Sequence, residues 1–344
     1  MNLIPRYNIK ENYNHHPHVV ILGAGASLAA FPDGDKNGRK LPLMNDIVRT
    51  ISLNEELNAL GITAEIIDFE TTFDDLNTKY QGNAHFEKIK SKIYQYFREL
   101  EIPDKLTLYD KLILSLREND LIATFNWDPL LCQAFQRNRH IKRLPKIAFL
   151  HGNVFVGMCN EHKSTGFINC TCSKCENKFE KVDLLYPVTN KNYTQNEFIK
   201  GEWELLQTNL EVAYLITIFG YSAPKTDIAA RELMFNVWKK NKTRDLGEIE
   251  IIDIAQKSSI QANWAVFFIR EHYWITSSFE QSYLSLYPRR SCEAFASSSL
   301  YNDPWGDIES FVGNSLSEYH KWINRIIQSE ELHDIDNANP LSRW

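Results

Sequence analysis

Five mostly apolar runs, each with glycine or a polar residue at its carboxyl end, constrain the fold of this chain most. They lie at residues 18–22, 121–125, 147–150, 214–219 and 249–254. Continuous apolar runs are typical of strands that are buried on both faces, as the strands of parallel sheets are. Helical patterns separate the runs; in one of them, apolar residues recur at three-to-four spacing from Phe86 to Leu100. The sequence therefore predicts an α/β fold with a Rossmann-like parallel sheet and helices on both of its faces.

The composition is that of an ordinary globular protein and argues against several classes of function. The 344 residues are 43% hydrophobic and 24% charged, and 38 basic against 44 acidic side chains give a net charge of −6. No global field attracts nucleic acid, so direct nucleic-acid binding is not expected. We interpret the densest basic stretch, residues 137–143, as a solvated loop or helix end rather than a phosphate or partner patch. No segment reaches the ~18 apolar residues of a membrane span and residues 1–11 lack a signal-peptide pattern, so we expect a cytoplasmic protein.

A glycine turn directly follows the first apolar run. Residues 23–27 read Gly-Ala-Gly-Ala-Ser. Glycines at a strand-to-helix turn let the backbone approach a diphosphate and direct helix N–H groups toward it. Leu28 stands where the G-x-G-x-x-G signature has its third glycine. Taken alone, the motif is therefore explained equally well by a tight turn that binds nothing.

Two later strand ends carry candidate catalytic groups. Asn126 and Asp128 follow the second apolar run, and His151 follows the third. A histidine at the ligand-binding edge of a sheet suits proton transfer near neutral pH. Asn126 can both donate and accept hydrogen bonds, so it can orient a water or a ribose hydroxyl. His151 by itself is more simply a core histidine, but in combination with Asn126, Asp128 and the glycine turn the pattern favours catalysis.

Taken together and in order, these motifs resemble the sirtuin family. The glycine turn resembles the family's NAD-binding turn, and Ala-Phe-Pro-Asp at 30–33 resembles its Ala-Gly-Ile-Pro-Asp stretch with one residue deleted. Residues 124–128 match its Thr-x-Asn-x-Asp motif, and residues 151–152 match its catalytic His-Gly pair. Gly-Tyr-Ser at 220–222 resembles the Gly-Thr-Ser turn that lines the family's cofactor pocket. The resemblance covers about residues 18–255.

The resemblance implies NAD as the ligand and gives roles to single residues. His151 would act as general base, with Asn126 and Asp128 beside the nicotinamide ribose and the bond that is cleaved. The other contacts that it implies, around the diphosphate and the riboses, are Gly23, Ala24, Gly25, Ser27, Asp33, Thr124, Gly220, Ser222 and Asp253.

Four of the six cysteines cluster between residues 159 and 175. Thiolate and imidazole groups two residues apart form knuckles that suit tetrahedral zinc, and a chain without an export signal favours metal over disulfides. Sirtuins carry a structural four-cysteine zinc module just after the His-Gly pair, so the position agrees. We expect Cys159, Cys172 and Cys175 to bind structural zinc, with Cys170 or His162 as the fourth ligand. The alternative is a set of reduced cysteines without metal.

Two departures from the family weigh against a protein deacylase. Family deacylases carry a Phe-Gly-Glu segment after the zinc module, which pairs with the acyl-lysine peptide, whereas residues 183–188 read Asp-Leu-Leu-Tyr-Pro-Val. The usual Phe-Arg after Pro-Asp is replaced by Gly-Asp-Lys-Asn-Gly at 34–38. The glycine turn, Phe-Asn-Trp-Asp and Gly-Tyr-Ser-x-Pro-x-Thr-Asp at 220–227 resemble instead the bacterial sirtuin-like proteins of antiphage defence, which consume cellular NAD.

We therefore expect an NAD+ hydrolase that releases nicotinamide and ADP-ribose as an NAD-depleting effector of antiphage defence. An NAD-dependent protein deacylase, and a sensor or scaffold that binds NAD or ADP-ribose without turnover, are the alternatives. Because an uncontrolled hydrolase would kill its host, we expect a homo-oligomer or a partner such as a DNA-translocating ATPase. The expected organisation is a catalytic domain at 1–272, containing a helical insert at about 50–106 and a cysteine-rich module at about 153–200, and a C-terminal extension at 273–344.

Overall fold

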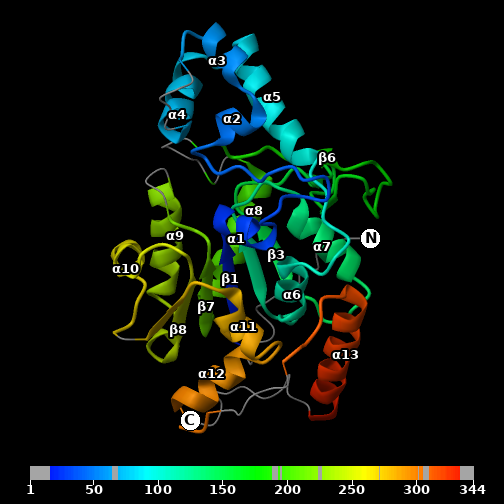
Figure 1. Cartoon of the computed structure of the whole chain (residues 1–344), viewed down its shortest axis with the longest axis vertical. Coiled ribbons are helices and arrows are strands. Elements are labelled where there is room, and N and C mark those ends of the chain that lie inside the picture. The colour runs from blue at the N-terminus through cyan, green and yellow to red at the C-terminus, as the bar shows by residue number, and fades with distance from the viewer. Residues whose placement is uncertain are drawn as a thin grey trace.

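A six-stranded parallel sheet forms the centre of the molecule (Figure 1). The structure is a computed structural model, and it describes residues 16–63, 69–187, 193, 196–223, 227–270, 272–300, 302–304 and 310–333. The predicted Rossmann-like sheet is confirmed, and the strands nearest its centre are buried along their whole length. The strands are β1 (His18–Leu22), β2 (Leu121–Thr124), β3 (Lys146–Phe149), β7 (Leu215–Phe219), β8 (Glu248–Ile252) and β9 (Tyr273–Thr276).

The strand order β3-β2-β1-β7-β8-β9 places a topological switch point between β1 and β7. The chain builds outward from β1 to β3, then crosses back and builds outward from β7 to β9. In this order, the crevice outside the carboxyl ends of the two central strands is where ligands of doubly wound sheets bind. The register pairs Leu22 with both Thr124 and Phe219, so the residues that follow β1, β2 and β7 leave the sheet side by side.

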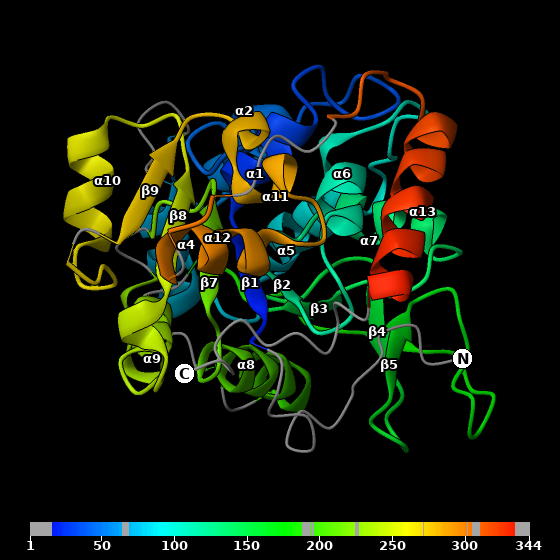
Figure 2. The same ribbon diagram turned by 90° about the horizontal axis from the view of Figure 1, so that it is seen from below.

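Helices cover both faces of the sheet. Figure 2 shows α8 and α9 along one side, and α1 and α6 along the other. A capping box starts α6, because the Thr107 and Asp110 side chains bond to each other's backbone N–H groups. Every helix in the described part of the chain is too short or too polar to cross a membrane. The covering helices are α1 (Ala24–Ala30), α6 (Leu108–Leu114), α7 (Leu130–Asn138), α8 (Glu197–Leu210) and α9 (Ile228–Trp238), and α10 (Lys257–Trp264) joins β8 to β9.

The segment expected as an insert forms a group of helices beyond the carboxyl edge of the sheet (Figure 1). Its longest helix buries Phe86, Ile89, Ile93 and Phe97, which is the apolar face that the spacing predicts. The ring of Phe73 stacks on Tyr186 at 5.0 Å, and this contact joins the insert to the later part of the cysteine-rich module. The helices are α2 (Ile47–Ile51), α3 (Asn54–Ala59), α4 (Phe69–Lys79) and α5 (Ala84–Arg98).

The cysteine-rich module is a small antiparallel sheet with the order β5-β4-β6. Residues 188–192 and 194–195 of the expected module range lie outside the described residues, as do residues 224–226 of the Gly-Tyr-Ser motif. Backbone glycines allow its strands to approach, because a Cβ at Gly157 would lie 2.6 Å from the Glu180 carbonyl oxygen. The strands are β4 (Val156–Met158), β5 (Thr165–Phe167) and β6 (Glu180–Lys181).

The C-terminal region begins differently from the expectation of an extension at residue 273. Residues 273–276 form β9 and pair with β8, so the main sheet continues beyond the predicted boundary. The helices after β9 then return across the molecule, and α13 lies beside α6 and α7 (Figure 2). They are α11 (Tyr283–Leu286), α12 (Ser291–Leu300) and α13 (Leu316–His333).

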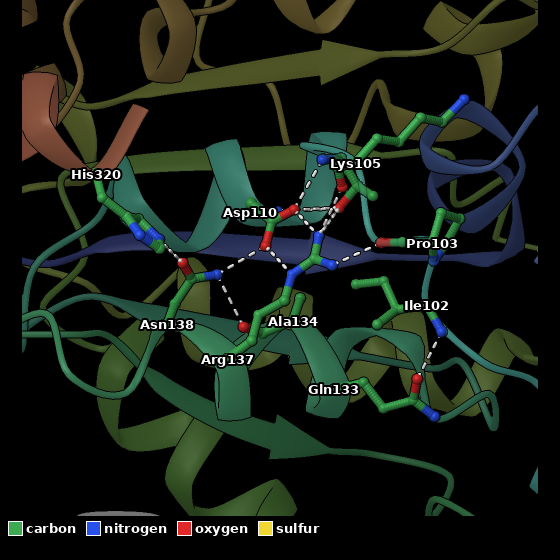
Figure 3. Close-up of polar contacts among 10 residues, drawn as sticks. Ile102, Pro103, Lys105, Asp110, Gln133, Ala134, Arg137, Asn138 and His320 are labelled. Carbon is green, nitrogen blue, oxygen red and sulfur yellow. Dashed lines mark hydrogen bonds and ion pairs between the residues drawn. The ribbon is translucent and has the colours of Figure 1, made fainter. Parts of the chain in front are cut away.

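A buried polar network fastens α13 to the sheet-covering helices (Figure 3). Asp110 accepts hydrogen bonds from Arg137 Nε at 2.7 Å and from Asn138 Nδ2 at 2.8 Å. Asn138 Oδ1 in turn lies 2.6 Å from Nε2 of His320 on α13. Arg137 belongs to the basic stretch 137–143, and its guanidinium also donates to the carbonyl of Pro103. The side chain of Arg137, the first residue of that stretch, therefore makes hydrogen bonds within the protein and is not available to a ligand.

Candidate active site

Two glycine turns interlock at the switch point of the sheet. The Gly25 N–H donates to the Gly220 carbonyl at 2.9 Å, and the Gly23 N–H donates to the Phe219 carbonyl at 3.0 Å. Gly220 has a φ of +60°, and a Cβ there would lie 2.2 Å from the Ala26 nitrogen. A Cβ on Gly25 would lie 2.8 Å from the Gly220 Cα. Only glycine fits these contacts, so the two turns hold each other in place by backbone alone.

The missing side chain of Gly23 leaves room for Tyr221, whose ring stacks on a second aromatic ring at this edge. Phe125 follows β2 and Tyr221 follows β7, on either side of β1. Their rings stack with centroids 4.2 Å apart and an interplanar angle of 13°. A Cβ on Gly23 would lie 2.7 Å from the Tyr221 Cβ. The glycine turn therefore serves aromatic packing at this edge as well as backbone approach.

Asn126 is held at the exit of β2 by a network that starts at the glycine turn. Its side-chain Nδ2 donates to the Gly23 carbonyl at 2.9 Å and to the Ser27 hydroxyl at 2.9 Å. Its backbone N–H donates to the Thr124 hydroxyl at 3.0 Å. The amide of Asn126 is thus fixed, and its side chain remains partly exposed at the switch point. The structure brings these four predicted site residues together.

Asp128 lies behind Asn126 and is buried, in contrast to the expectation that it borders the cleaved bond. Its Oδ2 accepts from the Ser27 hydroxyl at 2.7 Å, and its Oδ1 accepts from the Leu130 N–H at 3.1 Å. Burial raises the pKa of the Asp128 carboxyl, and the Ser27 hydrogen bond opposes that shift. Both carboxylate oxygens of Asp128 accept hydrogen bonds from within the protein. Asp128 therefore holds Ser27 and, through Ser27, Asn126.

His151 lies at the exit of β3, next to the exit of β2. Its imidazole makes an edge contact with the Phe125 ring at 4.7 Å and is parallel to the Tyr193 ring at 6.2 Å. Its Nε2 lies 3.9 Å from Oδ1 of Asp227, the residue that precedes α9. Gly152 has a φ of +76°, and a Cβ there would lie 2.4 Å from the Asp183 carbonyl oxygen, so the His-Gly pair needs its glycine.

The remaining predicted cofactor contacts are spread more widely. Ala24 is exposed at the start of α1, and Ser222 is exposed beyond β7. Asp253 leaves β8 at the same edge of the sheet, and its carboxylate accepts from the Ala255 N–H at 2.8 Å. Asp33 is exposed on the loop after α1, where it pairs with Lys105 at 3.5 Å rather than with any of the residues above.

Two residues that hydrogen-bond within the network around Asn126 were not predicted. The Tyr109 hydroxyl, from α6, lies 2.6 Å from the Ser27 hydroxyl. Asn153 Nδ2 donates to the Asp128 carbonyl at 2.7 Å and to the Asn126 carbonyl at 3.3 Å, which ties the exits of β2 and β3 together. Asn153 follows the His-Gly pair closely and its position was a usable signal, whereas Tyr109 belongs to an unremarkable helical pattern.

Four side chains of the cysteine-rich module converge on one point. The ligand atoms of Cys159, His162, Cys172 and Cys175 all lie within 4.8 Å of one another. The two Sγ atoms of Cys159 and Cys175 are 3.6 Å apart, and Nδ1 of His162 is 3.8 Å from Sγ of Cys159. Ligands at 2.0–2.3 Å from a tetrahedral ion lie roughly 3.4–3.8 Å apart, so this donor set fits zinc.

Of the two candidates for the fourth ligand, the structure places His162 in the converging group and leaves Cys170 outside it. The reason is the knuckle spacing. Cys159 and His162 form one two-residue knuckle, whose turn is closed by a contact of 3.4 Å between the His162 N–H and the Cys159 Sγ. Cys172 and Cys175 have the same spacing and form the second, which leaves Cys170 outside both.

Solved structures of Sir2 proteins are similar to this chain at low sequence identity. A Sir2 complex with the inhibitor EX-527, 2'-O-acetyl-ADP-ribose and a deacetylated p53 peptide is 15% identical, with a TM-score of 0.39 over 86% of this chain and 97% of that one. A Sir2 homologue in complex with NAD is 13% identical, with a TM-score of 0.37 over 79% and 89% of the two chains. No protein-family model matches the sequence, and no curated protein matches it. We therefore infer the function from the site itself.

Proposed function

We propose that this chain is a sirtuin-like NAD+ hydrolase that cleaves the bond between nicotinamide and ribose. The observation that carries the proposal is the meeting of Asn126, His151 and the glycine turn at the switch point of a parallel sheet. Dinucleotides bind at such a point, with the diphosphate near a glycine turn that opens a helix. An amide and an imidazole at adjacent strand exits are the groups that this cleavage needs.

In the proposed reaction, NAD lies across the carboxyl edge with its nicotinamide ribose beside Asn126. The C–N bond breaks through an oxocarbenium-like state, and the electron pair leaves with nicotinamide. A water oxygen bonds to the ribose carbon, and His151 takes the water's proton, so the products are nicotinamide, ADP-ribose and a proton. General base assistance of this kind contributes roughly 100- to 10,000-fold to the rate.

The four-ligand group has a structural role in this proposal. Cys159, His162, Cys172 and Cys175 would hold one zinc ion, which fixes the module that follows His151 in the chain. Because the four protein ligands complete a tetrahedron, no position is left for a substrate, and the zinc would supply stability rather than chemistry.

Water is the proposed acceptor because the segment that would pair with a peptide is already engaged. The Leu185 N–H, within the segment 183–188, donates to the His151 carbonyl at 2.9 Å. Tyr186 then packs its ring against Trp127 at 5.3 Å. The backbone of this segment therefore supports the His151 turn, which favours a hydrolase over a deacylase.

An NAD-consumption assay tests the proposal. The purified full chain is incubated with NAD without any peptide, and nicotinamide and ADP-ribose are quantified by chromatography. We expect both products from the wild type and a loss of at least ~100-fold in the His151→Ala variant. Release of nicotinamide only after addition of an acyl-lysine peptide would establish the deacylase instead. Saturable NAD binding without product would establish a sensor.

We also propose that the activity is under control, as an NAD-depleting defence effector in the cytoplasm would require. A homo-oligomer, or a partner such as a DNA-translocating ATPase, would supply that control. The test is the specific activity over a range of protein concentrations, with the mass of the active species measured by light scattering. A monomer that is fully active at all concentrations would contradict the control proposal and leave the hydrolase proposal intact.

A further inference from the structure

Asp227 is an acidic residue at a helix start that does not cap its helix. It occupies the N-cap position of α9, yet its side chain makes no capping hydrogen bond. Aspartate is common at this position because its carboxylate usually accepts from the N–H groups of the first turn. Here the carboxylate turns toward the exit of β3 instead, where Oδ1 lies 3.9 Å from Nε2 of His151. Helix capping therefore does not explain the orientation of the side chain.

A tyrosine fixes the second oxygen of this carboxylate. The Tyr221 hydroxyl donates to Oδ2 of Asp227 at 3.1 Å, and the Tyr221 ring is itself held by the stack on Phe125. Burial, followed by the charge of Asp227, raises the pKa of Tyr221 well above its usual value, so this hydroxyl stays protonated and remains a donor. The ring of Tyr193 is parallel to the imidazole, and the same two causes raise the pKa of its hydroxyl.

The pair is shielded from solvent. The side chains of His151 and Asp227 are only 8% and 7% exposed. Two opposite charges at this distance interact far more strongly in such surroundings than at a surface, because little water screens them. The tyrosines beside the carboxylate stay neutral, so the imidazole of His151 is the group of this cluster that can take up a proton and become cationic.

We propose that Asp227 is a positioning residue for His151, which it orients and whose positive charge it offsets. The inference deepens the proposed hydrolase and rests on it for its catalytic meaning. When the imidazole takes a proton from water it gains one positive charge, whichever ring nitrogen accepts the proton. The carboxylate of Asp227 stabilises that charge, and the 3.9 Å separation shortens as the charge forms, since catalytic hydrogen bonds often tighten only in the reacting complex.

The first test needs no substrate. The pKa of His151 is measured by NMR with isotope-labelled histidine, and its signal is assigned among the ten histidines with a His151→Gln variant. We expect the Asp227→Asn variant to lower the pKa of His151 by about one pH unit or more, because an opposite charge at this range favours the cationic form by that amount. Asp227→Ser gives a second uncharged N-cap residue in case one variant folds poorly. An unchanged pKa of His151 in a folded variant overturns the proposal.

The second test follows the pH profile of kcat/KM for NAD. Asp227→Asn is expected to move the acidic limb to lower pH by about the same interval and to lower the plateau by roughly 10- to 100-fold, because the imidazole becomes a weaker base. Asp227→Glu should restore part of the limb position and part of the plateau rate. Asp245 lies on the exposed short helix before β8, and Asp245→Asn should change neither the limb nor the plateau. Among the described residues, the other titratable groups around the pair include Tyr193, Tyr221 and, from α4, Glu70. A fall in rate without movement of the limb would mean a purely structural role and would contradict the proposal.

The two tests separate the two proposals. If the wild type leaves NAD intact while the pKa of His151 still depends on Asp227, the hydrolase fails and the pairing stands. If the wild type cleaves NAD but neither the pKa nor the limb responds to Asp227, the pairing fails and the hydrolase stands.

Discussion

At the scale of single residues, some contacts of the site could be predicted from the sequence motifs, and others depend on how distant elements pack. Gly23, Asn126 and His151 were predicted to share one edge, because the carboxyl ends of parallel strands always do. Their contacts with Ser27 and Thr124 follow from the same motifs. Tyr109 could not be predicted, because its bond to Ser27 spans 82 residues and depends on how α6 packs. The inward position of Asp128 is likewise a product of packing.

Replacement of Gly220 by alanine tests the interlocked turns. A Cβ at Gly220 would meet the Ala26 nitrogen at 2.2 Å, and the φ of +60° adds backbone strain. We expect Gly220→Ala to lower the free energy of unfolding by about 3 kcal/mol or more, as strain of about 1–2 kcal/mol combines with a clash against rigid backbone. Urea denaturation measures the change. Gly82→Ala is the matched control, because Gly82 has a φ of +80° with nothing within 4 Å, and should show only the strain. Equal losses in both variants would refute the interlock.

At the scale of elements, the fully buried strands were predictable and the partly exposed edge strand β9 was not. Continuous apolar runs predicted β1, β2, β3, β7 and β8, because strands buried on both faces need them. β9 has a half-exposed Trp274 and lacks such a run, so the sequence placed it in the extension. The four converging side chains of the cysteine-rich module show the same division. Spacing identified the module, and the choice between His162 and Cys170 needed the fold of the two knuckles.

Metal analysis of the module separates the two candidate fourth ligands. We expect one zinc ion per chain in the wild type and in Cys170→Ser. We expect loss of the ion in Cys175→Ser, because Cys175 belongs to the converging group and Cys170 does not. Inductively coupled plasma mass spectrometry gives the stoichiometry. Thermal unfolding should show Cys175→Ser to be the less stable variant, since binding of a structural zinc contributes to folding free energy. Loss of zinc from Cys170→Ser as well would make Cys170, not His162, the fourth ligand.

The attachment of α13 is expected to weaken in acid. Burial, followed by the nearby His140, lowers the pKa of His320 below 6.5. Because the unfolded state then takes up the proton first, the stability from this contact is full above pH 6.5 and is lost as the pH falls toward the lowered value. Hydrogen exchange of α13, corrected for intrinsic rates, should accelerate between pH 7.5 and 5.5. His320→Gln retains a donor for Asn138 without titrating and should remove most of this dependence; acceleration of equal size in the variant would exclude His320 as its source.

At the scale of the whole molecule, one buried carboxyl group ties the sheet to the C-terminal helices. Glu250 lies in β8 and accepts hydrogen bonds from the Thr217 hydroxyl at 2.6 Å and from the Tyr283 N–H at 2.8 Å. The Thr217 hydroxyl also contacts Nε2 of His18 at 2.7 Å, so the network crosses from β8 through β7 to β1. Burial raises the pKa of Glu250 from 4.5 to about 7.

This network predicts that the whole chain is less stable above neutral pH. Since the folded pKa of Glu250 is raised, the folded state binds the proton more tightly, and stability declines as the pH rises from 4.5 to about 7. Ionisation of Glu250 lowers the free energy of unfolding by about 3 kcal/mol over this range. The pKa of the neighbouring Glu248 is raised too, so its ionisation acts in the same direction. Glu250→Gln should flatten the dependence measured by urea denaturation at pH 5 and pH 8. A variant curve parallel to that of the wild type would show that Glu250 is not the responsible group.

The attachment of α13 to α7 also has a consequence for how the protein is made. The contact between His320 and Asn138 joins residues 182 positions apart. At ribosomal speeds of about 5–20 residues per second, roughly 9–36 s pass between synthesis of the two partners. During that interval the nascent chain presents the outer surface of α6 and α7 uncovered, together with the Asp110 network behind it. This surface therefore stays accessible to chaperones and proteases until α13 has been synthesised and docks.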